Sequence, residues 1–301
     1  MNIGLVGRGF VGNAIYENFK SKHNFLVYDH NPAIANVGSL KEVCENTKII
    51  FVALPTPMTE DGQCDTSAIF NTVRVINECD SDNIVVLKST VVPGTCEKIR
   101  EIYPNLRIVF SPEFLTEKNS IQDFKECNRV IFGGHQRDTQ ICKNLFEGMF
   151  PNKEYRLTDW RTAEMLKYFL NTFLATKVSF ANEMYQVCEL LQIDYKEVLD
   201  LALLDDRLSE SHFQVPGPDG DLGFGGTCFP KDINAIINFC KNRGMSTDIL
   251  CAVWDKNLKV RSNLDWLEKL GRAIIKKENK DATIKPSDGS HHDGASRVAI
   301  K

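Results

Sequence analysis

Several clusters of polar residues in this sequence combine side-chain types and spacings that could do chemistry. The sharpest is G-F-G-G-T-C-F-P-K-D (Gly223–Asp232), where a glycine-rich loop ends at Cys228 and a Lys231–Asp232 pair opens a predicted helix. A thiol at a helix N-terminus beside a lysine is favoured as a thiolate. We therefore predict that Cys228 is a nucleophile, whereas any other of the ten cysteines is best interpreted as a small buried hydrophobe.

A second cluster lies within a long apolar stretch, E-M-L-K-Y-F-L-N-T-F. Lys167 and Asn171 are four residues apart, which places both side chains on one face of a helix. Both side chains donate hydrogen bonds, so together they could hold an oxyanion. The alternative interpretation is a solvated lysine beside an exposed asparagine.

Three further segments each follow a predicted strand: L-P-T-P (54–57), K-S-T-V-V-P-G-T (88–95) and S-P-E-F-L-T-E (111–117). Loops at the carboxyl ends of parallel strands line the ligand crevice of such a sheet. Glu113 and Glu117 are four residues apart, and either could move a proton or activate water unless both are surface carboxylates. Thr56 could touch a cofactor.

A G-x-G-x-x-G pattern stands between a predicted strand and a predicted helix. Gly7 permits the tight turn, Gly9 lets the backbone approach a pyrophosphate, and Gly12 allows close helix–strand packing. Asp29 ends the next strand, where its carboxylate would accept hydrogen bonds from ribose hydroxyls and repel a 2′-phosphate. The pattern therefore predicts NAD rather than NADP.

The predicted secondary structure that positions these residues differs between the two halves of the chain. Residues 1–157 alternate helix-compatible stretches with short β-branched runs at residues 3–6, 25–28, 49–53, 84–87, 107–110 and 130–132. This alternation predicts an α/β fold with a Rossmann-type, doubly wound parallel sheet. Predicted helices in this region include residues 12–21 and 66–79.

Residues 158–275 are predicted to form an all-helical domain for dimerisation and catalysis, which carries the Cys228 loop. The stretch from Thr158 to Ile193 has no glycine or proline, which indicates one helix of about 30 residues. Its apolar stripe suggests a dimer interface and contains Met165, Phe169, Phe173 and Phe180. Further helices are expected at residues 196–204, 231–243 and 245–275. The polar tail 276–301 is expected to be disordered.

Composition narrows the class of protein. The chain has 301 residues, of which 43% are hydrophobic and 25% charged, which excludes a mainly disordered or collagen-like chain. A net charge of -4 offers no bulk attraction for nucleic acid or an anionic membrane. The absence of a long apolar run and of a basic leader predicts a cytoplasmic protein without a membrane span. Scattered cysteines and histidines predict neither a disulfide framework nor a metal site.

The eight motifs G-L-V-G-R-G-F-V-G, L-P-T-P, K-S-T-V-V-P-G-T, S-P-E-F-L-T-E, E-M-L-K-Y-F-L-N, N-E, D-D-R and G-F-G-G-T-C-F-P-K-D occur in this order. Over about residues 1–270 the chain thereby resembles the UDP-glucose/GDP-mannose dehydrogenase family. The resemblance implies an NAD-dependent, four-electron oxidation of a sugar 6-alcohol to a uronic acid, such as UDP-glucose to UDP-glucuronate for polysaccharide biosynthesis. It also implies thiohemiacetal and thioester intermediates on Cys228.

The resemblance further assigns roles by motif. Lys167 and Asn171 would bind the C6 oxygen, while Asp232, Thr90 and Glu117 would order and activate water. Cofactor-binding residues would be Gly7, Gly9, Phe10, Val11, Gly12, Asp29, Thr56, Thr90, Glu117 and Lys231. Substrate-binding residues would be Glu113, Phe114, Leu115, Lys167, Asn171, Gly225 and Arg207, the last reaching the partner's substrate in a homodimer built on the long helix.

The sequence also departs from the family pattern. Family members usually continue into a second Rossmann-like domain that covers the nucleotide, so we expect weak substrate binding or a separate chain that supplies this domain. The stretch 208–222 is longer than usual, which leaves its substrate contacts unassigned.

Three other readings stay open at this point. GDP-mannose is an alternative substrate. A second alternative is a two-electron β-hydroxy-acid dehydrogenase, but that chemistry would not need Cys228. A third is a non-catalytic NAD-binding remnant, but such a protein would not need the complete set of catalytic side chains.

Overall fold

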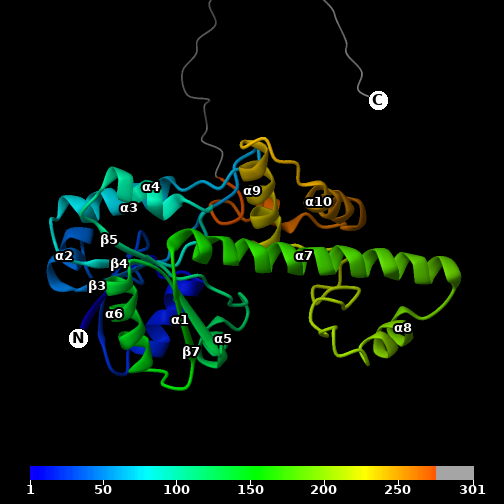
Figure 1. The fold of residues 1–301 in the computed structure, drawn as a ribbon, viewed down its shortest axis with the longest axis horizontal. Coiled ribbons are helices and arrows are strands. Elements are labelled where there is room, and N and C mark those ends of the chain that lie inside the picture. The colour runs from blue at the N-terminus through cyan, green and yellow to red at the C-terminus, as the bar shows by residue number, and fades with distance from the viewer. Residues whose placement is uncertain (276–301) are drawn as a thin grey trace, which may run out of the picture.

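Seven strands form one sheet in the computed structural model, which describes residues 1–275 (Figure 1). The strand order is β2-β1-β3-β4-β5-β6-β7, and all neighbouring pairs are parallel except β5 and β6. The strands are β1 (Asn2–Val6), β2 (Asn24–Tyr28), β3 (Ile49–Val52), β4 (Ile84–Leu87), β5 (Arg107–Phe110), β6 (Arg129–Gly134) and β7 (Glu154–Thr158). The order reverses between β1 and β3, where such sheets bind ligands at their carboxyl edge.

The predicted Rossmann-type α/β fold is confirmed, with two differences in detail. One pair of neighbouring strands, β5 and β6, is antiparallel, with Phe110 opposite Gly133. The sequence analysis also missed β7, because E-Y-R-L-T is a half-exposed edge strand without a continuous apolar run. Just after β7, the Trp160 side chain donates to the Ile108 carbonyl oxygen of β5 at 2.9 Å.

Helices cover both faces of the sheet. One face is packed by α1 (Phe10–Phe19), α5 (Ser120–Glu126) and α6 (Gln136–Glu147), and the other by α2 (Leu40–Asn46), α3 (Ser67–Glu78) and α4 (Thr95–Ile102). Adjacent strand residues alternate between the two cores: Leu5 and Phe51 face α1, whereas Val6 and Val52 face α2 and α3. Both faces being buried explains why the strand sequences are apolar throughout.

The helix α7 (Trp160–Leu191) leads from the sheet into the helical region, as predicted (Figure 1). Its 32 residues correspond to about 48 Å. Asp159 caps its N-terminus, and α9 (Phe229–Lys241), α10 (Asp248–Val260) and α8 (Tyr195–Ala202) pack along it. The division into domains at residue 157 stays a prediction.

The helix predicted over residues 245–275 was wrong beyond Val260. There the chain turns away, because the Asp221 carboxylate accepts hydrogen bonds from the backbone amides of Ser262 and Asn263. Residues 261–275 instead form a short 3-10 helix, η1 (Asp265–Glu268), and a turn that brings Leu270 beside Ile274. The tail predicted to be disordered, 276–301, lies outside the described residues.

Neither a membrane-spanning helix nor a cluster of metal-ligating side chains is present in residues 1–275. No helix there combines the length and the apolar character that a membrane crossing needs. The same residues contain no group of three or more potential metal-ligating side chains.

Gly133 provides a test of how α7 is seated on the sheet. A Cβ built at Gly133 would lie 2.5 Å from the Ala163 Cβ and 2.6 Å from the Asp159 carbonyl oxygen. Gly133→Ala should therefore lower the free energy of unfolding by about 1–3 kcal/mol through overpacking, measured by urea denaturation. The matched control is Gly148→Ala, whose nearest contacts are at 3.5 Å or more and which should cost nothing. Equal stability of the two variants would refute this close approach.

Candidate active site

A cleft of about 740 Å³ opens at the carboxyl ends of β1, β3 and β4. It brings together thirteen of the residues singled out in the sequence, although they come from loops far apart in the chain. These residues are Gly7, Gly9, Phe10, Val11, Asp29, Thr56, Thr90, Glu113, Leu115, Glu117, Lys167, Cys228 and Lys231. The cleft therefore joins the glycine motif to the cysteine loop.

The glycine motif leaves the N-terminus of α1 open toward the cleft. Gly7 has a φ of +86°, and a Cβ at Gly12 would lie 2.0 Å from the Gly7 carbonyl oxygen. No side chain caps α1, and its first turn contains no acidic residue. A Cβ built at Gly9 meets no atom within 4 Å, so this backbone is accessible. The free amides can therefore receive an anion.

Asp29 is held at the end of β2. Its two carboxylate oxygens accept hydrogen bonds from the backbone amides of Arg8, at 2.7 Å, and Asn31, at 2.8 Å. These bonds orient the carboxylate where a nucleoside ribose would lie relative to the open helix end. The residues present thus fit the adenosine and pyrophosphate groups of a dinucleotide.

Cys228 is the N-cap residue of α9, and its thiol lies beside the first turn of that helix. The Thr227 hydroxyl is 3.7 Å from the Cys228 Sγ. Burial disfavours the Lys231 ammonium, but the charges of Asp232, Cys228 and Cys64 outweigh that effect and raise the pKa of Lys231. Lys231 is therefore a cation at neutral pH, next to the thiol.

Asp232 connects α9 to α7. The carboxylate is 1% exposed, and it accepts hydrogen bonds from the Asn171 amide on one oxygen and the Lys231 ammonium on the other. A buried carboxylate requires such donors. This pairing fixes the Asn171 side chain relative to Cys228. Neither Asn171 nor Asp232 is among the residues that line the cleft.

Two buried lysines flank Glu113. The Lys167 Nζ donates to the Glu113 carbonyl oxygen at 2.5 Å, whereas the Lys88 Nζ lies 3.1 Å from the Glu113 carboxylate. The Lys88 ammonium also donates to the Ser111 hydroxyl at 3.1 Å. The sequence analysis did not single out Lys88. A lysine directly after the buried strand I-V-V-L was the available signal, since a charge there requires a partner.

Thr90 is positioned by two contacts of its loop. The Thr56 hydroxyl donates to the Thr90 carbonyl oxygen at 2.7 Å. Farther along the loop, the buried Glu164 carboxylate of α7 accepts the backbone amides of Gly94 and Cys96, at 2.6 and 2.9 Å. These bonds fasten the 88–95 loop to the helix that carries Lys167 and Asn171.

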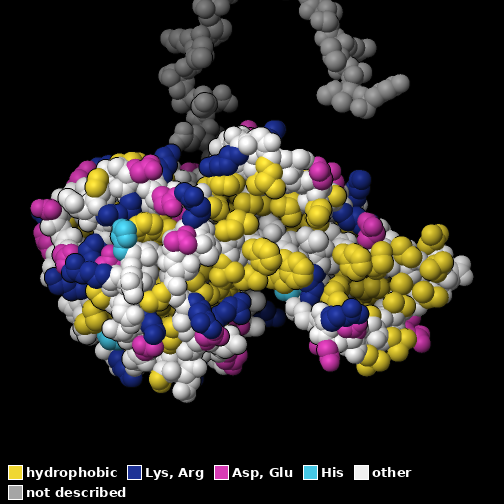
Figure 2. Space-filling view, viewed as in Figure 1, with side chains coloured by type: hydrophobic (Ala, Val, Ile, Leu, Met, Phe, Trp, Pro, Cys, Tyr) yellow, Lys and Arg dark blue, Asp and Glu magenta, His cyan; other side chains and the backbone are white. Residues whose placement is uncertain are grey.

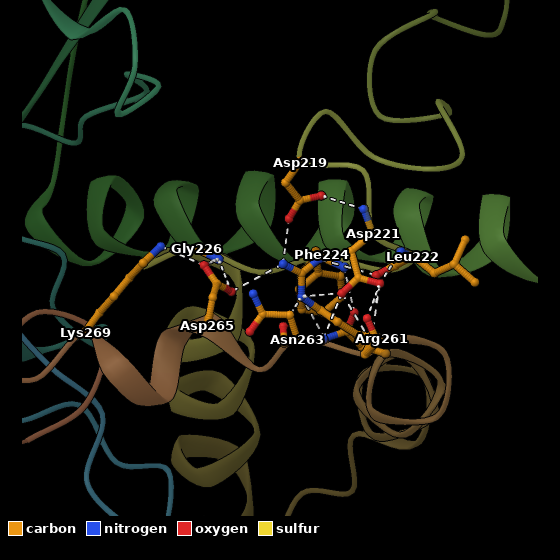
Figure 3. A network of polar contacts seen from close by, with 12 residues as sticks. Asp219, Asp221, Leu222, Phe224, Gly226, Arg261, Asn263, Asp265 and Lys269 are labelled. Atoms are coloured by element: carbon orange, nitrogen blue, oxygen red, sulfur yellow. Dashed lines mark hydrogen bonds and ion pairs between the residues drawn. The ribbon is translucent and has the colours of Figure 1, made fainter.

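A polar network supports the glycine loop that precedes Cys228 (Figure 3). The Arg261 guanidinium donates to the Asp219 carboxylate at 2.6 Å and to the Asp265 carboxylate at 3.3 Å. Asp265 accepts the Gly226 amide at 3.1 Å. A Cβ at Gly225 would lie 2.2 Å from both the Arg261 Nη2 and the Asp265 Oδ1. The loop thus rests directly on this ion pair.

Four of the seven proposed substrate residues are not among those that line the cleft, namely Phe114, Asn171, Arg207 and Gly225. Arg207 follows α8, has an 87% exposed side chain and pairs with Asp205. Phe114 lies beneath the Lys167 ammonium, which is 5.7 Å from the ring centroid. Within one copy of the chain, Arg207 is not brought together with Cys228.

Two models of one protein family match this chain. Residues 33–150 match the model of the UDP-glucose/GDP-mannose dehydrogenase family NAD binding domain, and residues 161–259 match that of the central domain. The UDP-glucose 6-dehydrogenases of Rickettsia bellii and Pseudomonas aeruginosa are 33% and 34% identical over 83% and 75% of this chain. They are covered over 56% and 52% of their own length.

A solved structure also matches the fold. A UDP-glucose dehydrogenase from Pyrobaculum islandicum superimposes with a TM-score of 0.78 at 28% identity, covering 86% of this chain and 68% of that one. The chain spans about half the length of the curated relatives it matches.

The Asp221 carboxylate holds the chain after α10 to the glycine loop, so its contribution to stability should depend on pH. Burial favours the protonated form, but hydrogen bonds from the amides of Asn263 and Leu222 and from Ser262 dominate and lower the pKa of Asp221 to about 2. Because this pKa lies below the ordinary 3.8, the stabilisation is present above about pH 4 and is lost as the pH falls toward 2.

Asp221→Asn should lower the free energy of unfolding by about 1–3 kcal/mol at neutral pH. Its difference from the wild type should shrink below about pH 4, as measured by urea denaturation across the pH range. Asp200→Asn, at an exposed ion pair with Lys196, is the matched control and should change little. A pH-independent loss in the Asp221 variant would contradict the role of the carboxylate.

Proposed function

Since this chain belongs to the UDP-glucose/GDP-mannose dehydrogenase family, we propose that it oxidises the 6-hydroxyl of a nucleotide sugar to a carboxylate with two NAD. The preferred reaction is UDP-glucose to UDP-glucuronate, in line with the names of the curated relatives. The observation that carries the proposal is the position of Cys228 in the same cleft as the glycine motif and Lys167. A nucleophilic thiol is required only if oxidation proceeds past the aldehyde.

The chain's own residues have distinct tasks in this reaction. NAD, when bound, accepts a hydride in each of the two oxidations. Lys167 and Asn171 donate hydrogen bonds to the sugar C6 oxygen and stabilise the negative charge that develops on it. The Cys228 sulfur adds to the aldehyde as a thiohemiacetal, whose oxidation yields a thioester. Water cleaves the thioester, releasing the acid and the free thiol.

Glu117 is the carboxylate that we assign to the water step. It faces the cleft and accepts a hydrogen bond from the Thr227 hydroxyl at 3.3 Å, beside Cys228. The Glu117 side chain is 40% exposed. Asp232, by contrast, is 1% exposed, and its oxygens accept hydrogen bonds from Asn171 and Lys231. We therefore propose that Asp232 acts mainly by holding these two donors, while Glu117 and Thr90 order the water.

We further propose that the active form is a homodimer built on α7. Phe169, Phe173 and Phe180 are 61%, 55% and 56% exposed, although they are large apolar side chains. Figure 2 shows hydrophobic side chains that continue along α7 to its far end. An apolar patch of this kind marks an association surface. A second copy would bring the exposed Arg207 to its partner's cleft. A cytoplasmic location stays a prediction.

Replacement of the nucleophile tests the reaction. Cys228→Ser should lower turnover to the acid about 10³-fold or more, roughly 4 kcal/mol of barrier, because a serine hydroxyl is far less ionised than a thiol. NAD binding should be retained. Cys251→Ser, which removes an exposed thiol on α10, is the matched control. Uronic acid formation at the wild-type rate by the Cys228 variant would refute the nucleophile assignment.

The yield of NADH separates the alternatives. The proposed reaction gives two NADH per molecule of UDP-glucose. A yield of two only with GDP-mannose would identify that sugar nucleotide instead, and one NADH per molecule would indicate an alcohol oxidation without a thioester. No NADH with either, in a chain that still binds NAD, would indicate a non-catalytic protein.

Dilution tests the dimer. The specific activity should fall as the chain is diluted, because Arg207 completes the partner's site. Phe173→Ser should move this fall to higher protein concentration by weakening the apolar contact. Ile102→Ser, which alters an exposed apolar residue on α4, is the control. A monomer with full activity in light scattering would exclude this assembly.

A further inference from the structure

Residues 261–275, here called the return segment, run back from α10 to the mouth of the cleft. Trp266 anchors the segment: it is 2% exposed, and its ring centroid lies 5.5 Å from that of Trp254. At its end, the Met58 amide donates to the Ala273 carbonyl oxygen at 2.8 Å, and the Ile275 amide donates to the Met58 carbonyl oxygen at 3.0 Å. The return segment is therefore fastened on both sides of Arg272.

Arg272 is the one residue of the return segment that lines the cleft. Its guanidinium pairs with the Glu117 carboxylate and lies 5.9 Å from the centroid of the Phe10 ring. Phe10 is the first residue of α1, so Arg272 stands next to the helix end that the glycine motif leaves open. The sequence analysis did not single out Arg272.

The other Lys and Arg side chains of the cleft make contacts that are less exposed. Lys88 pairs with the Glu113 carboxylate, Lys167 with the Glu113 carbonyl and Lys231 with Asp232. The Arg8 guanidinium lies 3.7 Å over the Tyr16 ring and 3.6 Å from Glu17, and its Nε donates to the Asn13 side chain at 3.1 Å. The Arg272–Glu117 pair, by contrast, is 49% and 40% exposed. Exposed ion pairs contribute little, so this pair is easily exchanged.

We propose that Arg272 binds the pyrophosphate of the dinucleotide and leaves Glu117 in doing so. A guanidinium can hold two phosphate oxygens at once, and the open amides of α1 receive the same anion from the opposite side. The exchange also frees the Glu117 carboxylate, which becomes available to order water only when the cofactor is bound. This inference rests on the cofactor of the proposed function, but not on its substrate.

The test measures binding of ADP-ribose, which carries the pyrophosphate but cannot be reduced. Isothermal titration of the full chain compares the wild type, Arg272→Gln, Glu117→Gln and the double variant. Arg272→Gln should weaken binding about 10-fold or more. Glu117→Gln should tighten binding, because Arg272 no longer has to leave a carboxylate.

The double variant separates direct contact from charge screening. If Arg272 binds the pyrophosphate, Arg272→Gln still weakens ADP-ribose binding in the Glu117→Gln background. If Arg272 merely neutralises Glu117, the substitution is silent there, and the proposal is overturned. Arg272→Lys, which keeps the charge but loses the two-pronged geometry, should bind with intermediate affinity, and thermal melting shows whether each variant is folded.

Three controls identify the anion. Adenosine, which has no phosphate, and UDP, which represents the sugar nucleotide, should bind wild type and Arg272→Gln alike. A loss confined to UDP would assign Arg272 to the substrate and overturn the inference. Arg156→Gln removes an equal charge at an exposed pair on β7 and should change nothing. A wild type that binds neither NAD nor ADP-ribose would refute the proposed function as well, whereas equal binding by Arg272→Gln refutes this inference alone.

Discussion

The buried carboxylate of Asp232 is the constraint on which the catalytic half of the cleft depends. A carboxylate that is 1% exposed needs donors on both oxygens, and here they come from Asn171 on α7 and Lys231 on α9. Lys231 and Asp232 both belong to α9, so the bond from Asn171 is the one that ties this carboxylate to α7. Cys228, at the N-terminus of the same helix α9, lines the cleft together with the glycine motif. Packing of α7 against the sheet then carries Lys167 to Glu113.

Charged side chains also hold the loops that have no regular secondary structure. Glu164 on α7 fastens the 88–95 loop by accepting two backbone amides, and the Arg261–Asp265 pair supports the glycine loop before Cys228 (Figure 3). In both cases a charged side chain binds backbone groups that no helix or strand would satisfy. The return segment contributes Arg272 to the lining of the cleft. Its contact with Glu117 links the cofactor end of the cleft to the thiol end.

Much of this arrangement could be predicted because the relevant signals are local. Buried parallel strands are continuous apolar runs, so six of the seven strands were found, whereas the half-exposed β7 was not. The presence of Asp29 in the cleft could be predicted because it directly follows a strand. Lys88, Glu164 and Arg272 were missed, since each acquires its role from a partner that is distant in the sequence. The end of α10 was misplaced because Asp221, about forty residues earlier, captures the amides of Ser262 and Asn263.

By itself the sequence determined the class of sheet, the open helix end at Gly9 and the cysteine at the start of α9, because glycine geometry, strand hydrophobicity and helix capping act over a few residues. Only the tertiary structure decided which charges meet. It committed Asp232 to Asn171, left Glu117 facing the cleft and brought Arg272 beside Phe10. The reason is physical: the cost of burying a charge is settled by its nearest partners, and those partners are chosen by packing rather than by spacing along the chain.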